Sequence, residues 1–498
     1  MINNKEKKEI ARPPVVVVLG HIDHGKTALL DYIRKTNVVE KEAGGITQHV
    51  GAYEIEHQGK KITFVDTPGH EAFSQIRSRG AKAADIAVLV VDATEGVKAQ
   101  TKEAISHIKI AQIPLIVAIN KIDKPEADSN KAKRELFQEG VIVESMGGEV
   151  PSVETSAVTG KGVSDLLDLI LLIAEMEGLK ADLSLPAQGV VIESYLDKKR
   201  GPTATLILME GILKPGQIIG TPSAFGKIRI LEDFQGRPIS QAFPSQPAVA
   251  VGFEKVPFVG ENFKVFASVE EAKEKMEKEK GKVFLEALDV EEGEKILNLI
   301  IKADVLGSLE AIEQIIKSLP RDKGVVPRIL KGEVGEVNEN DVKLASQAKA
   351  TILGFRVKTG PQAALLAERE KIRIRHFEII YELIEEVRRL MEKMIMPEIV
   401  RNDLGRLKVS VVFLTEKNRQ IVGGKVIEGE VKKGSLLEIE RGQEIIGKGK
   451  IVNLQKNKKN IEAAGKGEEA AILYEGKEKI EEGDILMIYT EEKKKITF

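Results

Sequence analysis

The eight residues GHIDHGKT, at positions 20–27, follow the apolar run VVVVL and precede the helix-like segment ALLDYIRK. They match the pattern G-x-x-x-x-G-K-T between a strand and a helix, in which backbone N–H groups of the loop surround phosphate groups. The lysine supplies a cation to the β and γ phosphates, the threonine hydroxyl can ligate Mg²⁺, and the start of the helix adds a favourable dipole. The sequence therefore predicts a nucleotide site that includes Gly20, His21, Ile22, Asp23, His24, Gly25, Lys26 and Thr27.

The overall composition limits the classes of protein to consider. A chain of 498 residues predicts three to five domains. Its 75 basic and 77 acidic residues give a net charge of -2, which argues against a chain that wraps DNA but permits a local basic face. The absence of cysteine excludes disulfides and thiolate metal sites. The polar N-terminus MINNKEKKEI and the short apolar runs predict a cytoplasmic protein without membrane contact.

Residues 12–181 alternate between strand-like and helix-like segments. VVVVL, KITFVD, IAVLVVDA and PLIVAIN are apolar strands, and helical segments lie between several of them. This alternation predicts a parallel sheet covered by helices, in which ligands bind at the carboxyl ends of the strands.

Two further segments fit the phosphate end of the nucleotide. DTPGH (residues 66–70) follows the strand KITFV, so Asp66 can hold the Mg²⁺ shell and Gly69 can offer its N–H to a γ-phosphate, with Thr67 and Pro68 between them. EAGGITQHVGAY (residues 42–53) is a Gly-containing loop in which the Thr47 hydroxyl can reach Mg²⁺ and order the loop in the triphosphate state. Each string alone is equally typical of a surface turn or loop.

NKID (residues 120–123) and SAVTG (residues 156–160) also follow predicted strands and indicate which base is bound. A carboxylate at Asp123 accepts two hydrogen bonds from the N1–H and the exocyclic amine of guanine, whereas adenine would leave it unpaired. The Ala157 N–H can meet the guanine carbonyl, and Asn120, Lys121 and Ser156 complete the set. The order of all four strings predicts a GTPase domain that binds GTP or GDP.

The remaining chain predicts a multidomain protein. We expect a tail (1–11), the α/β phosphate-loop GTPase domain (12–181), a β-barrel (182–267), a charged linker (268–293), an α/β domain (294–377), a connecting helix (378–396) and a C-terminal β-barrel (399–498). The connecting helix has apolar residues at helical spacing, which fits a packed helix or a rigid spacer equally well. EGILKPGQII (residues 210–219) and EGEVKKGSLL (residues 428–437) share Glu, Gly, Lys and Gly at the same offsets, which suggests two copies of one barrel type.

GHIDHGKT, DTPGHEAF and NKID resemble the translational GTPases. EAGGITQHVGAY, DTPGHEAF, RSRGA and IVAINKIDKP resemble, more specifically, the bacterial translation initiation factor two family. The resemblance covers nearly the whole chain, and it implies the same domain order. It also implies a factor that binds GTP, places formylmethionyl initiator tRNA on the small ribosomal subunit and promotes joining of the large subunit. His70 then corresponds to the family's histidine that orients the attacking water, ribosomal RNA is a contact, and we expect a monomer.

The chain departs from that family in two respects. Only about eleven residues precede the GTPase domain, so contacts made by the family's long N-terminal extension must be absent or replaced. Cysteines that the family usually has near its initiator-tRNA pocket correspond to Gly424 and Ala470. The C-terminal barrel has 20 Lys and Arg against 17 Asp and Glu, and its cluster QKNKKN (residues 455–460) is either an RNA-phosphate contact or a charged surface loop. Few aromatic residues are interleaved with these charges, so the sequence does not indicate base stacking.

Two other functions compete with initiation. An elongation-type or ribosome-biogenesis GTPase would share the nucleotide motifs, although the stretch at 42–53 and the distal half argue against it. A binding scaffold that holds GTP only as a structural ligand would not need Lys26, Thr47 and His70 together.

Overall fold

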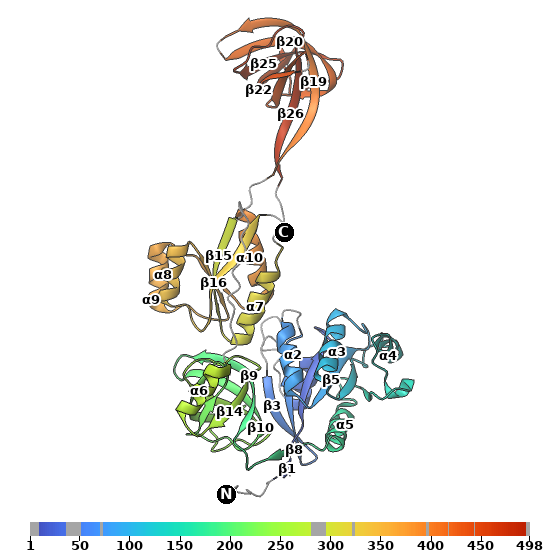
Figure 1. Cartoon of the computed structure of the whole chain (residues 1–498). Coiled ribbons are helices and arrows are strands. Elements are labelled where there is room, and N and C mark those ends of the chain that lie inside the picture. Colours follow the sequence, from blue (N-terminus) through green and yellow to red (C-terminus); the bar gives the residue numbers. More distant parts are fainter. Residues whose placement is uncertain are drawn as a thin grey trace. The chain divides into compact units, whose positions relative to one another are not determined.

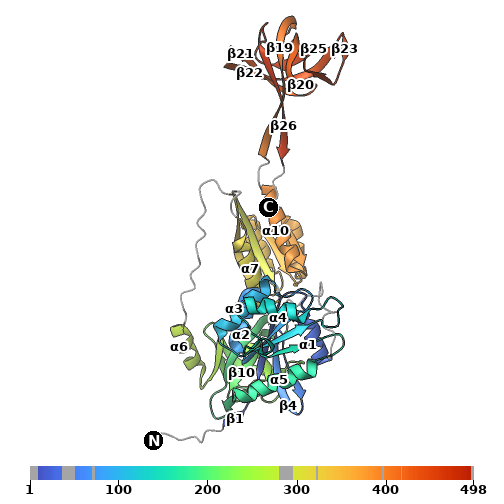
Figure 2. The same ribbon diagram turned by 90° about the vertical axis from the view of Figure 1, so that its right-hand side faces the viewer.

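The protein is described here from a computed structural model. It describes residues 9–35, 51–69, 73–279, 295–320, 324–394, 398–416, 418–442 and 444–494. The chain divides into two compact units, Met1–Met391 and Glu392–Phe498 (Figures 1 and 2).

The first sheet has six strands in the order β3-β4-β2-β5-β6-β7. Its elements are β2 (Val15–Gly20), α1 (Lys26–Arg34), β3 (Gly51–His57), β4 (Lys60–Asp66), α2 (Ser74–Ala83), β5 (Ile86–Asp92), α3 (Ala99–Ala111), β6 (Leu115–Asn120), α4 (Ser129–Gln138), η3 (Glu144–Met146), β7 (Ser152–Glu154) and α5 (Val163–Met176). All pairings are parallel except that of β3 with β4. Every residue of β2 and β5 is buried, as continuous apolar runs require in a sheet covered on both faces.

Helices cover the two faces of this sheet. Apolar residues of α1 and α5 form one core with the strands, including Leu29, Leu30, Leu166 and Ile170. α2 and α3 contact β2, and α3 also contacts β5. The carboxyl ends of β2, β4, β5 and β6 therefore meet at one open edge, where Asp92 pairs in register with Asn120.

The second sheet is a closed antiparallel barrel in the order β10-β13-β12-β11-β14-β9. Its strands are β9 (Gln188–Asp197), β10 (Gly201–Glu210), β11 (Ile218–Gly220), β12 (Phe225–Asp233), β13 (Pro247–Phe253) and β14 (Asn262–Phe266). A two-stranded pair of β1 (Glu9–Ala11) and β8 (Lys180–Asp182) precedes it, so the last residues of the expected tail form a strand.

The segment expected to be a charged linker contains a helix, α6 (Val269–Glu279). It lies against the barrel strands β11, β12 and β14, and Figure 1 shows it beside the barrel. Ala272 is buried, because a small apolar residue among charged neighbours gives the helix a face that can pack. Residues 280–293 of the expected linker lie outside the described residues.

The third sheet is parallel in the order β16-β15-β17-β18. Its elements are β15 (Lys295–Ala303), α7 (Leu306–Ser318), β16 (Val325–Val334), α8 (Glu339–Ala348), β17 (Thr351–Phe355), α9 (Pro361–Glu370), β18 (Ile374–Phe377) and α10 (Ile380–Met394). In α10 the apolar stripe is buried, including Leu383, Val387 and Met391. This burial favours the packed-helix alternative over the rigid spacer.

The unit Glu392–Phe498 is a second barrel. Its strands are β19 (Glu398–Thr415), β20 (Arg419–Lys432), β21 (Leu436–Arg441), β22 (Glu444–Lys456), β23 (Lys459–Asn460), β24 (Ala463–Gly465), β25 (Glu469–Gly476) and β26 (Ile485–Lys494). The order β19-β26-β21-β22-β25-β20 is closed by the pairing of β19 with β20. The multidomain fold class predicted from the sequence is thus confirmed.

The repeated sequence motif has a structural cause. Gly216 (φ 88°) and Gly434 (φ 85°) occupy the same offset in the two copies and adopt the left-handed conformation that glycine tolerates best. The Gly216 amide donates to the Ile228 carbonyl at 2.7 Å, and the Gly434 amide donates to the Ile451 carbonyl at 2.9 Å. Both barrels therefore use one turn to begin their third strand, and their strands follow the same cyclic order.

Candidate functional site

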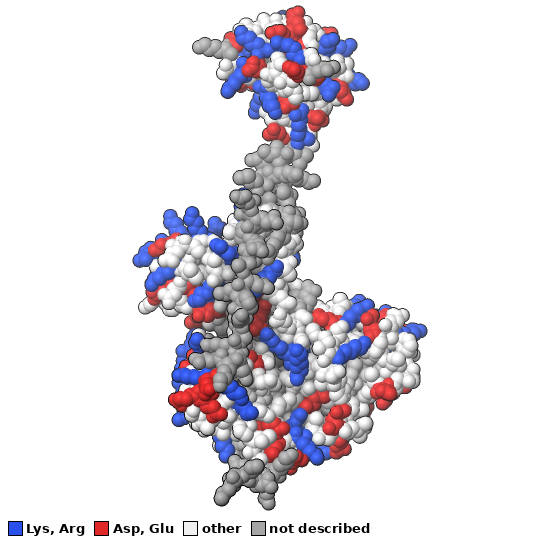
Figure 3. All heavy atoms as spheres, in the orientation of Figure 1, with Lys and Arg blue, Asp and Glu red and all other residues white. Residues whose placement is uncertain are grey.

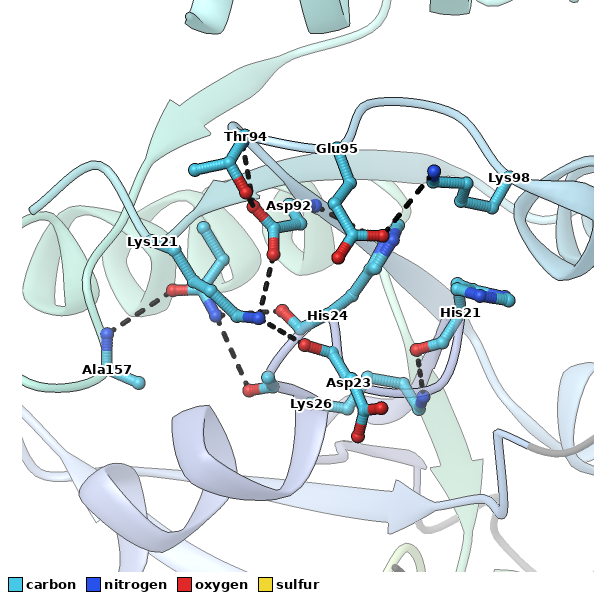
Figure 4. Close-up of polar contacts among 12 residues, drawn as sticks. His21, Asp23, His24, Lys26, Asp92, Thr94, Glu95, Lys98, Lys121 and Ala157 are labelled. Carbon is cyan, nitrogen blue, oxygen red and sulfur yellow. Dashed lines mark hydrogen bonds and ion pairs between the residues drawn. The ribbon is translucent and has the colours of Figure 1, made fainter. Parts of the chain in front are cut away.

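The phosphate loop lies between β2 and α1, where the sequence predicted it. Lys26 is 6% exposed, and its Nζ donates to the Gly20 carbonyl at 2.9 Å. It also donates to the His21 carbonyl at 2.7 Å (Figure 4). Burial lowers the pKa of Lys26 to about 8, against the opposing attraction of the Asp66 carboxylate. The loop thus presents a buried amine whose positive charge an incoming phosphate would stabilise.

The DTPG turn borders the loop on the side of β4. Asp66 is 3% exposed at the end of β4, and the Thr67 hydroxyl donates to the Val18 carbonyl of β2 at 3.0 Å. A Cβ added at Gly69 would lie 2.4 Å from Lys26 Nζ, so the turn comes close to the amine of the lysine. The two predicted phosphate-binding segments are therefore adjacent.

Asn120 joins the base-binding segments to the phosphate loop. It is fully buried, its Nδ2 donates to the His24 carbonyl at 3.0 Å, and its Oδ1 accepts from the Ala157 N–H at 3.3 Å. The Ser156 hydroxyl donates to Asp123 Oδ1 at 2.6 Å, and the Asp123 side chain is exposed. Asp123 and Ser156 are 33 residues apart in the sequence, so this bond joins the NKID and SAVTG segments into one surface.

Lys121 makes a second link between the two halves of the site. Its Nζ forms an ion pair with Asp92 Oδ2 at 2.7 Å and also donates to the Asp23 carbonyl (Figure 4). Asp92 is fully buried; burial alone would raise its pKa, but hydrogen bonds from Lys121 and Thr94 hold the pKa at about 2. A permanent carboxylate therefore anchors Lys121 beside the loop.

The two histidines of the loop contact other groups of the protein. His24 is fully buried, and its Nδ1 accepts the Asp92 N–H at 3.3 Å. Burial, followed by the neighbouring His21, lowers the pKa of His24 to about 4, so the ring is neutral at pH 7. Burial also lowers the pKa of His21, whose ring lies edge-on to that of His24 at 5.0 Å. The Ile22 N–H between them donates to Gln100 Oε1 at 2.9 Å.

Two of the predicted site residues lie outside the described part of the chain, and two residues that support the phosphate loop were not predicted. Thr47 and His70 lie outside the described residues. Asp92 and Gln100 support the loop but were not predicted; the position of Asp92 at the end of a buried strand was the available signal, whereas nothing in the sequence marks Gln100.

The residues present suit Mg²⁺ chemically. Asp66 offers a carboxylate and Thr27, in the first turn of α1, offers a hydroxyl, and Mg²⁺ prefers such oxygen ligands together with substrate phosphates. Within the described part of the chain, no three His, Asp or Glu side chains form a metal cluster of their own. A magnesium ion held here would depend on phosphate oxygens for much of its coordination shell.

The C-terminal barrel offers a separate surface. Gly424 of β20 and Ala470 of β25 are cross-strand partners. Close by, Phe413 is 63% exposed, and a Cβ on Gly423 would lie 2.7 Å from its ring. Lys458 and Lys459 are exposed at the β22–β23 turn, whereas Lys456 pairs with Glu468 at 2.6 Å. Figure 3 shows Lys and Arg interspersed with Asp and Glu on this barrel. Exposed charged residues are thus common on its surface, and an exposed phenylalanine is more unusual there than an exposed lysine.

Four models of known families match four consecutive segments of the chain, and each segment corresponds to one of the main sheets. Residues 12–176 match the Elongation factor Tu GTP binding domain, 186–266 match Elongation factor G domain 2, 270–388 match Translation-initiation factor 2, and 407–487 match Elongation factor Tu domain 4. No helix among the described residues has the length and apolar character needed to cross a membrane.

Curated relatives align along nearly the whole chain. Translation initiation factor IF-2 of Thermotoga sp. (strain RQ2) is 44% identical over 99% of this chain and 74% of its own length. The same factor from Caldanaerobacter subterraneus subsp. tengcongensis is 44% identical over 98% of this chain and 71% of its own length. The factor of Pelotomaculum thermopropionicum is 43% identical over 97% of this chain and 51% of its own length.

Proposed function

The chain belongs to the translation initiation factor IF-2 family and is a translation initiation GTPase, and from that premise we propose how its residues divide the work. It binds GTP and GDP together with Mg²⁺, promotes binding of formylmethionyl initiator tRNA to the small ribosomal subunit and promotes subunit joining. Hydrolysis is slow in the free protein and is stimulated by the assembled ribosome. We further propose a cytoplasmic monomer that contacts ribosomal RNA and neither DNA nor membrane.

One observation supports the nucleotide assignment above all others. Asn120 holds the phosphate loop with one end of its amide and the Ala157 N–H with the other, and Ser156 of the same segment holds Asp123. A base bound against Asp123 is thereby placed at a fixed distance from a phosphate bound at Lys26. The open acceptor of Asp123 matches the two donors of guanine and no donor pair of adenine.

The chemistry of hydrolysis requires charge stabilisation and positioning rather than a covalent intermediate. Lys26 and the backbone N–H groups of residues 20–27 stabilise charge on the phosphates. Gly69 offers its N–H to the γ-phosphate, and His70 orients the attacking water. Thr27, Asp66 and Thr47 would hold Mg²⁺, which would supply positive charge to the phosphate groups.

The C-terminal barrel is the proposed site for initiator tRNA. The exposed Phe413 provides a face on which a base or an apolar aminoacyl group can pack, and Lys458 and Lys459 provide phosphate contacts. The small residues Gly424 and Ala470 replace the family's cysteines without introducing a polar group.

Two measurements on the full chain test this function. Binding of formylmethionyl and unformylated initiator tRNA should differ in favour of the formylated form, and elongator tRNA should bind more weakly than either. GTP turnover should rise strongly when assembled ribosomes are added. A preference for elongator aminoacyl-tRNA would instead support the elongation-type alternative.

A further inference from the structure

Helix α2, which follows the DTPG turn, contains a fully buried arginine. Arg77 is 0% exposed. Its Nη1 donates to the Pro68 carbonyl at 3.0 Å, and its Nη2 donates to both carboxylate oxygens of Glu103 on α3, at 2.7 and 2.8 Å. A buried guanidinium is costly unless it is paired and hydrogen-bonded, so its partners indicate what it holds in place. Here the partners are the turn before α2 and a neighbouring helix.

The carboxylate of Glu103 extends this contact into a network. Glu103 Oε1 lies 3.1 Å from His107 Nε2, and the same nitrogen lies 3.2 Å from the Ser74 hydroxyl at the first residue of α2. Burial tends to raise the pKa of Glu103, but hydrogen bonds from His107, Ser74 and Arg77 hold the pKa at about 2. The network therefore fastens both the start of α2 and the turn that precedes it to α3.

The bond to the Pro68 carbonyl has a direct consequence for Gly69. The Pro68 C=O and the Gly69 N–H belong to one planar peptide unit, and in a trans peptide they point in opposite directions. No cis peptide occurs among the described residues. When Arg77 fixes the carbonyl, it also fixes the direction of the N–H on the other side of the unit. Gly69 is the residue whose added Cβ would lie 2.4 Å from Lys26 Nζ, so this peptide borders the phosphate loop.

We propose that Arg77, braced by Glu103, is a positioning residue for GTP hydrolysis that orients the Gly69 N–H toward the γ-phosphate. The inference rests on the proposed function in one respect, the contact of Gly69 with the γ-phosphate. GDP lacks that phosphate, so Arg77 distinguishes the triphosphate from the diphosphate without touching either. Arg77 acts through the Pro68–Gly69 peptide and has no role in base recognition.

The test compares affinities of the full chain for GDP and for a non-hydrolysable GTP analogue. In Arg77→Met, we expect affinity for the analogue to fall about tenfold to a hundredfold, the value of one hydrogen bond to a charged group, with affinity for GDP nearly unchanged. Ribosome-stimulated kcat should fall by a similar factor. Arg77→Lys keeps the charge but can reach the carbonyl or the carboxylate, not both, and should recover part of the loss.

A matched control separates positioning from general stability. Arg12 makes a similar two-point contact with Asp85, at 2.6 Å to each oxygen, before the start of β2. Arg12→Met should lower the melting temperature but leave the ratio of analogue to GDP affinity unchanged.

Each outcome decides the proposal. An unchanged ratio in Arg77→Met, or an equal loss of affinity for both nucleotides, would overturn it. If Arg77→Met does not fold, Glu103→Gln is the second variant, because it keeps the shape of the partner of Arg77. It should also lower the ratio of analogue to GDP affinity, by a smaller factor. An unchanged ratio in Glu103→Gln would overturn the proposal as well. The affinity ratio needs no ribosome, so failure of ribosome stimulation in the wild-type chain would contradict the proposed function and not the role of Arg77.

Discussion

Replacing Asp123 by asparagine should change the base preference from guanine to xanthine. The carboxylate is the proposed acceptor for the N1–H and the exocyclic amine of guanine, and each hydrogen bond to a charged group is worth about 1.5–3 kcal/mol. Losing two such bonds costs about 3–6 kcal/mol, so GDP should bind about 10²–10⁴-fold more weakly.

The structure also indicates how the new amide would be oriented. The Ser156 hydroxyl donates to Asp123 Oδ1 at 2.6 Å. In Asp123→Asn that hydroxyl still donates a hydrogen bond and therefore needs an oxygen as its acceptor. The amide oxygen then takes the position of Oδ1, and the NH₂ group faces the base. Xanthine has a carbonyl where guanine has its 2-amino group, and it can accept from that NH₂. Affinity for xanthosine diphosphate should therefore rise while affinity for GDP falls.

Fluorescence titration of the full chain with GDP, xanthosine diphosphate and ADP measures the change. Asp165→Asn on the exposed side of α5 is the matched control, because it removes the same charge from the same domain and should alter none of the three affinities. If Asp123→Asn retained its affinity for GDP, the assignment of Asp123 to the base would be refuted.

The remaining predictions concern stability and tRNA binding. His24 titrates near pH 6.5 when unfolded and at about 4 when folded, so the unfolded chain binds more protons between these values. Stability should rise with pH across that window by about 3 kcal/mol, and a His24→Asn variant should lose that component in urea unfolding at a series of pH values. Lys302 is 1% exposed and pairs with Asp341 at 3.4 Å and Glu333 at 2.6 Å; Asp341→Leu should reduce the free energy of unfolding by about 3 kcal/mol in thermal denaturation. Lys458→Ala should weaken initiator-tRNA binding and reduce the slope of log affinity against log salt by about one, whereas Phe413→Ala should weaken binding with the slope unchanged. An unaltered salt slope in the lysine variant would remove that residue from the RNA interface.

The sequence predicted the strands that carry the candidate nucleotide site because these elements obey local rules. Lys26 follows the buried apolar strand β2, whereas Asp66 and Asn120 are the last residues of β4 and β6. The ends of parallel strands meet at one edge whatever the rest of the chain does. The repeated barrel could also be anticipated, since Gly216 and Gly434 meet the same backbone requirement at the same offset.

Contacts between elements distant in the sequence could not be predicted in this way. Arg77 and Glu103 each read as ordinary charged residues on a helix, and only the packing of α2 beside α3 buries the first and brings it to Pro68. The packing of the helix within the expected linker was not predicted for the opposite reason: the buried Ala272 gives almost no periodic signal among its charged neighbours. Phe413 was overlooked because exposure of one aromatic residue depends on the strand face that it occupies.

The most direct test of the account is single-turnover GTP hydrolysis by the full chain, measured alone and with ribosomes assembled around formylmethionyl initiator tRNA. The account predicts slow cleavage in the free protein and a large acceleration only when both subunits and the tRNA are present. Equal rates with and without ribosomes would contradict it.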